Sequence, residues 1–217
     1  MTSLKPDIGA SALIVVDVQN DFVSEGGWFD RLAKKHPEAG VDMEFLRSSI
    51  PGIKKLVEAF GAGGQPVVYV KHVVRPDYVD ARFPYWRKFP DMDKVETQFI
   101  VEGTWGAEIV DELNPAPGEL VVVKKGLSGF HGTPLETILR NLGVTTCVMT
   151  GVTTTCCVSS TTRAGVEHNF HMMLVRDGMA DMHREGHEAE LGILSWLFGD
   201  VVTADQVIKM LKSLPSN

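Results

Sequence analysis

Cys157 has the clearest chemical potential in this chain, because it stands where an expected strand turns into an expected helix. Residues 151–158 read GVTTTCCV and follow an apolar strand expected over 145–150. A thiol at a helix N-terminus is biased toward the thiolate, since unpaired N–H groups and the helix dipole favour negative charge there. Such a thiol suits covalent catalysis, although a free cysteine is more often a small buried hydrophobe.

Two charged residues interrupt apolar strands at their C-terminal ends. Residues 12–18 read ALIVVDV, with Asp17 where the apolar run should finish, and residues 120–125 read LVVVKK, with Lys124 in the same position. In a parallel sheet the C-terminal strand ends border the crevice that binds ligands. Each residue alone could be a cap, a turn residue or a solvated strand end, but together with Cys157 they predict one cleft.

These three residue types form a plausible set for acyl transfer. Asp17 can accept the thiol proton of Cys157 and later pass it to a leaving amine. Lys124, as a fixed cation, would lower the pKa of both Asp17 and Cys157. Backbone N–H groups in the turn before the helix are placed to hold the oxyanion that forms when sulfur attacks a carbonyl.

The composition is that of a compact globular enzyme. The chain has 217 residues, of which 44% are hydrophobic and 23% charged, and we expect one domain over 1–217. A net charge of −7 without a basic cluster disfavours nucleic acid as a partner. No apolar run is long enough for a membrane span, and residues 1–7 do not resemble a signal peptide. Three cysteines, two of them adjacent, make a poor disulfide framework and favour a reducing cytoplasm.

Strand and helix patterns alternate along the chain, which predicts a parallel sheet covered by helices on both faces. Residues 24–40 read as a long loop, and residues 72–103 read as an irregular segment that forms a pocket wall or a subunit contact. Strands are expected over 12–18, 66–71, 119–124, 145–150 and 170–175. Helices are expected over 51–60, 104–113, 134–142, 157–168, 184–198 and 204–211.

Three motifs together resemble those of the isochorismatase-like cysteine hydrolases. They are residues 12–22 (ALIVVDVQNDF), residues 124–135 (KKGLSGFHGTPL) and residues 151–158. They occur in the family's order and span most of the chain, roughly from 11 to 180. The resemblance implies an α/β fold, with three α/β/α layers around a mainly parallel, six-stranded, Rossmann-like sheet.

The resemblance also assigns roles within the motifs. It selects Lys124 over Lys125 and Cys157 over Cys156, which gives a catalytic set of Asp17, Lys124 and Cys157. It implies that the backbone N–H groups of Thr153 and Cys157 form the oxyanion hole, and that the peptide bond before Thr153 is cis. No cofactor is implied.

The implied activity is that of a cysteine-dependent amidohydrolase. It would cleave a small amide or a ureido or carbamoyl C–N bond through a thioester and release ammonia or an amine. The branch that acts on ureidoacrylate, biuret and N-carbamoyl amides is most similar in residues 20–28, 103–106, 110–113 and 128–135. Asp181 stands near where some ureide hydrolases present a glutamine, so the exact ureide stays open.

Three alternatives are less well supported. The intact Cys157 argues against isochorismatase chemistry, which does not need a thiol nucleophile. A nicotinamidase-like enzyme would carry an Asp-x-His metal motif, but no aspartate stands two places before His72. A non-catalytic binding protein on the same fold should lack at least one member of the catalytic set.

Several further residues are candidates for substrate or metal contacts. Phe22, His72, Trp105 and Phe130 could line the cleft or belong to the core. His183 and His187 share the i, i+4 spacing of zinc ligands but have no evident third partner, so no metal is expected.

A homodimer or homotetramer is expected, because family members commonly assemble and one irregular stretch is rich in aromatic residues. These residues are Tyr78, Phe83, Tyr85, Trp86 and Phe89.

Overall fold

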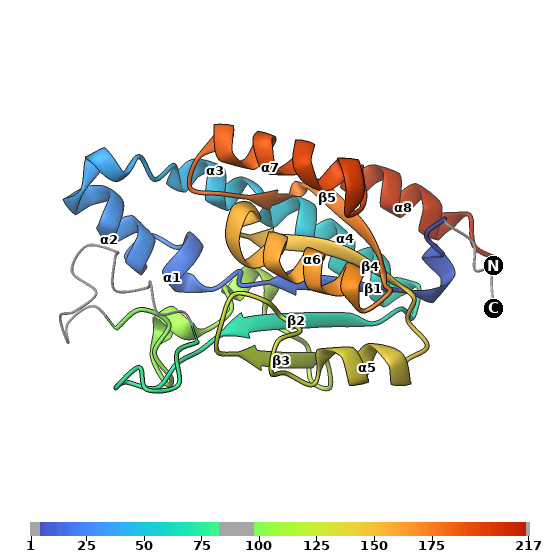
Figure 1. The fold of residues 1–217 in the computed structure, drawn as a ribbon, viewed down its shortest axis with the longest axis horizontal. Helices are drawn as coiled ribbons and strands as arrows, with labels where there is room; N and C mark the ends of the chain where they lie inside the picture. Colours follow the sequence, from blue (N-terminus) through green and yellow to red (C-terminus); the bar gives the residue numbers. More distant parts are fainter. Residues whose placement is uncertain (1–4, 83–97, 216–217) are drawn as a thin grey trace.

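A six-stranded, all-parallel sheet forms the centre of the molecule, with the strand order β3-β2-β1-β4-β5-β6 (Figure 1). The computed structural model describes residues 5–82 and 98–215. The strands are β1 (Ser11–Val16), β2 (Val67–His72), β3 (Leu120–Lys124), β4 (Thr146–Val152), β5 (His171–Ala180) and β6 (Asp200–Val202). The predicted α/β fold with a six-stranded parallel sheet is therefore confirmed.

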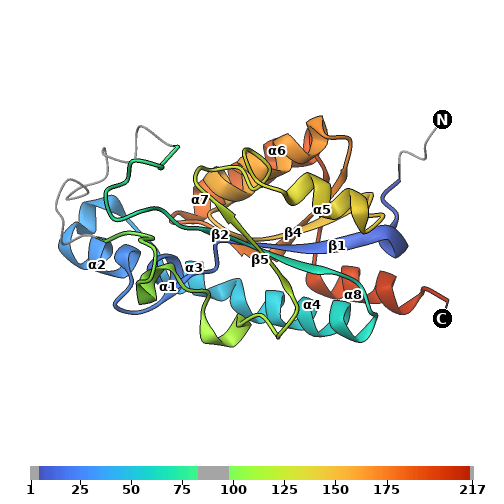
Figure 2. The same cartoon turned by 90° about the horizontal axis from the view of Figure 1, so that it is seen from below.

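Helices cover both faces of the sheet (Figure 2). One face carries α3 (Met43–Ser48), α4 (Ile50–Ala62) and α8 (Ala204–Lys212), and the other carries α5 (Leu135–Asn141), α6 (Ser159–Glu167) and α7 (Arg184–Leu197). Two short helices, α1 (Asn20–Val23) and α2 (Trp28–Lys35), lie beyond the C-terminal strand ends (Figure 1). None of the described helices is long and apolar enough to cross a bilayer.

The central strand β1 divides the core into two layers. Leu13 and Val15 pack in the cluster on the α4 side, whereas Ala12, Ile14 and Val16 pack in the cluster on the α6 side. All five are at most 2% exposed, as expected for a parallel strand that is covered on both faces. This continuous apolar run makes a charged residue directly after it conspicuous.

The order of the strands predicts where a ligand would bind. From β1 the chain moves outward through β2 to β3, and then returns to the other side of β1 for β4, β5 and β6. Ligands of such sheets bind outside the C-terminal strand ends, where the strand order reverses. Asp17 follows β1, His72 and Lys124 end β2 and β3, and Cys157 follows β4.

The described elements differ from the sequence predictions in several places, and the helices α1 and α3 were not expected. The expected loop over 24–40 contains α2, and the expected helix over 104–113 is two separate 3₁₀ turns, Trp105–Ala107 and Asp111–Leu113. The expected helix over 157–168 begins with a π-helical turn, Thr154–Val158, so that α6 starts only at Ser159. The short strand β6 had no separate sequence signal, because three residues are too few to show a period.

The helix α2 was missed because its apolar residues are few and its neighbours include Gly26 and Gly27. Its buried face consists of Trp28, Phe29 and Leu32, which are spaced as one side of a helix. The Asp30 carboxylate accepts the Gly26 N–H at 2.7 Å and pairs with Lys34 one turn later at 2.8 Å.

Gly151 should be indispensable for stability, because β4 passes very close to β1 there. Its φ is +109°, and an added Cβ would collide with the carbonyl oxygen of Val16. We expect Gly151→Ala to lower the free energy of unfolding by at least about 2 kcal/mol, measured by urea denaturation.

Gly143→Ala is the matched control for this prediction. Gly143 also has a positive φ, +70°, but an added Cβ would meet no atom within 4 Å. Gly143→Ala should therefore lower the free energy of unfolding by about 1 kcal/mol, because only the strained backbone conformation contributes. Equal losses in the two variants would contradict the collision with Val16.

Candidate active site

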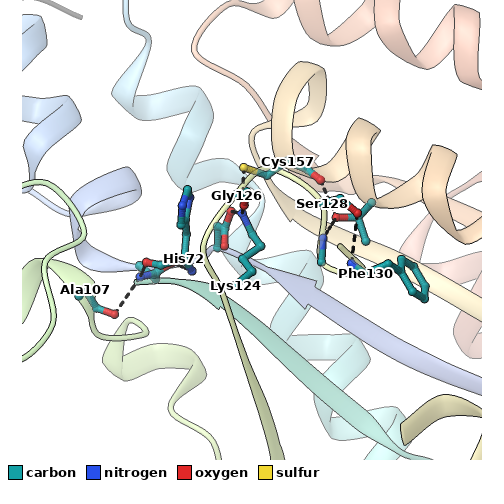
Figure 3. Close-up of polar contacts among 11 residues, drawn as sticks. His72, Ala107, Lys124, Gly126, Ser128, Phe130 and Cys157 are labelled. Atoms are coloured by element: carbon teal, nitrogen blue, oxygen red, sulfur yellow. Dashed lines mark hydrogen bonds and ion pairs between the residues drawn. The ribbon is translucent and has the colours of Figure 1, made fainter. Parts of the chain in front are cut away.

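The side chains of Asp17, Lys124 and Cys157 meet in one fully buried cluster. The Lys124 Nζ lies 2.8 Å from Asp17 Oδ2 and 3.3 Å from Cys157 Sγ, and it also donates to the Gly126 carbonyl at 2.8 Å (Figure 3). The side chains of Asp17 and Lys124 are both 0% exposed. An ammonium has three N–H donors, so each one has an acceptor here.

Asp17 is positioned by an unusual backbone conformation at the end of β1. Its φ is +52°, in the left-handed region that residues other than glycine seldom adopt. Its N–H still continues the sheet by donating to the Val70 carbonyl at 2.8 Å. Left-handed residues held in this way often occur at functional sites, where the surrounding structure enforces the conformation.

Cys157 lies in the π-helical turn that leads into α6. Such turns are rare and are frequent at functional sites. The Thr153 carbonyl accepts the N–H groups of Cys156 and Val158, and the Cys157 N–H between them takes no part in this pair of bonds. The peptide bond between Val152 and Thr153 is cis.

Buried side chains hold this turn from behind. Thr154 Oγ1 donates to the Ala180 carbonyl at 3.0 Å and lies 2.8 Å from His187 Nδ1 on α7. The Asp181 carboxylate accepts the Thr155 N–H at 2.6 Å. His187 is therefore part of the support of the nucleophile turn, and the structure does not pair it with His183 at a metal site.

The lysine loop and the cysteine helix are joined by Thr161. Its hydroxyl donates to the Cys157 carbonyl at 2.7 Å and accepts the Gly129 N–H at 2.8 Å. Ser128 accepts the Phe130 N–H at 3.1 Å within the same loop. The two Thr161 bonds tie the loop after β3 to the turn that carries Cys157.

Burial controls the charges in the cluster. It raises the pKa of the Asp17 carboxyl above its ordinary value, although Lys124 opposes the shift. It also raises the pKa of the Cys157 thiol well above its ordinary value, and the nearby Asp17 adds to the effect while Lys124 opposes it. For Lys124, burial lowers the pKa, but attraction to Asp17 and Cys157 outweighs it and the pKa is raised.

The sequence-based expectation that Lys124 lowers the pKa of both acids describes the effect of Lys124 itself, but the net pKa of each acid is raised. Lys124 does lower each pKa, but the loss of water on complete burial is larger. One cation can neutralise only one of the two acids. An Asp17 carboxylate paired with Lys124, next to a neutral Cys157 thiol, would balance the one cation with one anion.

A small cavity opens directly on this cluster. Its volume is about 90 Å³, and it reaches the Cys157 thiol and the Thr153 backbone. The other lining residues come from several segments of the chain. They are Phe22, Phe29, His72, Val74, Tyr78, Ala81, Phe99, Ile100, Leu127, Cys156 and Met182.

The four candidate substrate contacts divide into two pairs. Phe22 and His72 line the cavity. Trp105 is 56% exposed and does not line it, and Phe130 packs against His168 and Phe170 in the core. The Phe130 ring lies away from Cys157 (Figure 3).

Two buried residues with a structural role near the site were not singled out from the sequence. Gln19 donates to the carbonyls of His72 and Ala107 at 2.9 and 2.8 Å and accepts the His72 N–H at 2.8 Å. Asp21 accepts the N–H groups of Trp28 at 3.1 Å and Ile100 at 2.6 Å. The polar pair Gln19 and Asp21 directly after a buried strand was the available signal.

Three donor atoms near the cavity have the chemistry of metal ligands. Those of Asp17, His72 and Cys157 all lie within 4.8 Å of one another. The ammonium of Lys124 contacts two of the three, so a second cation would have to displace or oppose it. The expectation that no metal is needed stays a prediction.

The aromatic residues used to predict an oligomer lie mostly beyond the described part of the chain. Phe83, Tyr85, Trp86 and Phe89 are outside the described residues. Tyr78 is described; it lines the cavity, and its hydroxyl donates to the Phe99 carbonyl at 3.2 Å. The oligomeric state therefore stays a prediction.

Known amidohydrolases are similar to this chain over most of its length. A ureidoacrylate amidohydrolase, RutB, from Methylobacterium radiotolerans is 36% identical over 203 residues, which cover 89% of this chain and 76% of the relative. RutB from Pseudomonas syringae pv. syringae is 34% identical over 215 residues, which cover 93% and 83% of the two chains.

Solved structures agree as well. A cysteine hydrolase from Pseudomonas syringae pv. phaseolicola has a TM-score of 0.81 at 25% identity, covering 98% of this chain and 99% of that one. The N-carbamoylsarcosine amidase of Thermoplasma acidophilum has a TM-score of 0.70 at 26% identity, covering 90% and 96%. The isochorismatase domain model matches residues 11–206. The chain belongs to the isochorismatase family.

Proposed function

We propose that this protein is a cysteine amidohydrolase that cleaves a ureido or carbamoyl C–N bond of a small molecule through a thioester. The observation that carries the proposal is the Lys124 ammonium, which contacts both the Asp17 carboxylate and the Cys157 thiol beside a cavity. The relatives named as ureidoacrylate amidohydrolases and N-carbamoylsarcosine amidase support this choice of bond.

The first half-reaction begins with a neutral thiol. As Cys157 Sγ attacks the substrate carbonyl carbon, Asp17 accepts the thiol proton, so no free thiolate has to persist in the buried site. The carbonyl π electrons move to oxygen, and the backbone N–H groups of Thr153 and Cys157 are proposed to stabilise that oxyanion. Lys124 stays protonated and balances the negative charge.

The first half-reaction ends when the protonated Asp17 gives its proton to the leaving nitrogen as the C–N bond breaks, which releases ammonia or an amine and leaves a thioester on Cys157. In the second half-reaction Asp17 takes a proton from water as the water oxygen attacks the thioester carbonyl. The C–S bond of this intermediate then breaks, Asp17 returns the proton to the Cys157 sulfur, and the acid is released.

We also propose that the enzyme works in the cytoplasm. Cys147, Cys156 and Cys157 are all free thiols, which fits the expected reducing cytoplasm. No cofactor takes part in the proposed steps.

Cys157→Ala should abolish turnover, because it removes the thiol that contacts Lys124 and that would form the acyl intermediate. The loss should be roughly 10⁴-fold or more, measured as ammonia release from a panel of small ureides and primary amides. Cys156→Ala is the matched control and should still form an acyl-enzyme detectable by intact-mass spectrometry. If only Cys156→Ala lost the acyl-enzyme adduct, the assignment of Cys157 rather than Cys156 as the nucleophile would be wrong.

Lys124→Met should move the acid limb of the pH–rate profile to higher pH. Activity requires an ionised Asp17; burial raises its pKa and Lys124 lowers it, so removal of the cation raises it further. We expect a shift of roughly one to three pH units. Asp17→Asn should lose activity at every pH, since the amide cannot accept the thiol proton.

Lys125→Met is the control for this profile. Lys125 pairs with Asp80 at 2.7 Å, and its side chain is 32% exposed, so its loss should leave the acid limb in place. An unchanged acid limb in Lys124→Met would show that the cation does not set the pKa of Asp17.

We also propose that the protein is a homodimer or homotetramer, because the stretch over 76–103 is rich in aromatic residues, which are enriched at protein interfaces. Light scattering at micromolar concentration should give a mass of two or four chains. A monomer mass across that range would reject the proposal.

A further inference from the structure

We propose that the cavity selects an uncharged substrate with a compact apolar substituent, such as a monosubstituted urea with a short branched alkyl group. This inference rests on the proposed function. Eight of the lining residues are apolar, and they surround the approach to Cys157. They are Phe22, Phe29, Val74, Ala81, Phe99, Ile100, Leu127 and Met182.

The described lining residues include no cation that could receive a substrate carboxylate. Lys124 is behind the thiol, and its three donors are used by Asp17, Cys157 and Gly126. His72 does line the cavity, but burial and the adjacent Lys124 hold its pKa well below the ordinary value. The imidazole is therefore neutral near pH 7 and offers no positive charge.

Basic side chains close to the cavity are directed elsewhere. Lys125 pairs with Asp80 at 2.7 Å, and Arg75 pairs with Asp77 at 3.2 Å. The guanidinium of Arg82 lies against Gly132. None of these three cations belongs to the lining.

Two polar side chains around the cavity, Tyr78 and Asp181, already have partners within the protein. The Tyr78 hydroxyl donates to the Phe99 carbonyl. The carboxylate of Asp181, beside the wall residue Met182, accepts the N–H groups of Thr155 at 2.6 Å and of Met182 itself at 2.8 Å. Asp181 thus supplies negative charge near the wall, which opposes a second carboxylate.

The size of the cavity sets a further limit. Its volume of about 90 Å³ is well below the range of roughly 300–1,000 Å³ that is usual for drug-sized ligands. Only a few carbon atoms can follow the reacting carbonyl. An alkyl group there would gain from burial, whereas a carboxylate would lose its water without finding an ionic partner.

The test compares two ureas of matched shape. In 3-ureidopropionate a carboxylate ends the chain, and in 3-methylbutylurea an isopropyl group takes the place of that carboxylate. We expect kcat/KM for 3-methylbutylurea, from ammonia release, to be at least 100-fold higher. The amide pair succinamate and 4-methylpentanamide should show the same order.

A charge introduced into the wall should reverse this order. Met182 is a partly buried, unbranched wall residue, so Met182→Arg can place a cation in the cavity. We expect the ratio of kcat/KM for 3-ureidopropionate to that for 3-methylbutylurea to rise at least tenfold. In Met182→Leu, the size-matched control without charge, the preference should stay with the apolar urea.

The outcomes separate this inference from the proposed function. The inference is wrong if kcat/KM of the wild-type protein for 3-ureidopropionate equals or exceeds that for 3-methylbutylurea. That result would leave the proposed function in place. If none of the four compounds is hydrolysed and none slows alkylation of Cys157 by iodoacetamide, both fail. The wild-type comparison decides the matter even if Met182→Arg does not fold.

Discussion

The buried ion pair between Lys124 and Asp17 is the constraint on which the rest of the site depends. Removing two charges from water costs several kcal/mol per ion, and the mutual attraction repays this only if geometry and hydrogen bonding are good. Lys124 meets that condition with three acceptors, from Asp17, Gly126 and Cys157. The ends of β1 and β3, the loop after β3 and the π turn after β4 must therefore all meet at one ammonium. Disturbing any of them would leave a charge buried without its partner.

In the proposed mechanism, the same burial decides how the Cys157 thiol is activated. Two acids compete for one cation, and burial raises the pKa of both Asp17 and Cys157. A permanently ionised thiol would be a second negative charge beside a single positive one. Transfer of its proton to Asp17 during attack keeps the net charge of the cluster constant through the reaction, which a low-dielectric site favours. The helix terminus alone, from which the sequence suggested a preformed thiolate, is too weak to offset complete burial.

Asp17 and Lys124, two of the three residues of the cluster, could be singled out from the sequence because each one interrupts an apolar strand. An acid or a base at the end of an apolar strand is visible without any knowledge of tertiary structure, and parallel strands bring such ends to one edge. The cavity walls carry no such signal, since Phe22, Tyr78, Phe99 and Met182 come from segments far apart in the chain. Trp105 and Phe130 are both aromatic and both lie outside the strands and α-helices, yet one is exposed and the other lies in the core. The net direction of the pKa shifts of Asp17 and Cys157 also could not be predicted from the sequence, because it depends on burial.

The cluster of Asp17, Lys124 and Cys157 and the walls of the cavity are held in place by different hydrogen bonds. The reacting groups sit on strand ends and on the π turn, fixed by the sheet and by Thr154, Thr161 and Lys124. The walls are loops and short helices tied to the sheet by two buried side chains, Gln19 and Asp21, which accept or donate only to backbone groups. Bonds to the backbone place no demand on the side chains that those loops carry. The walls can therefore change from polar to apolar without disturbing the ion pair, so that one catalytic cluster can serve substrates of different charge.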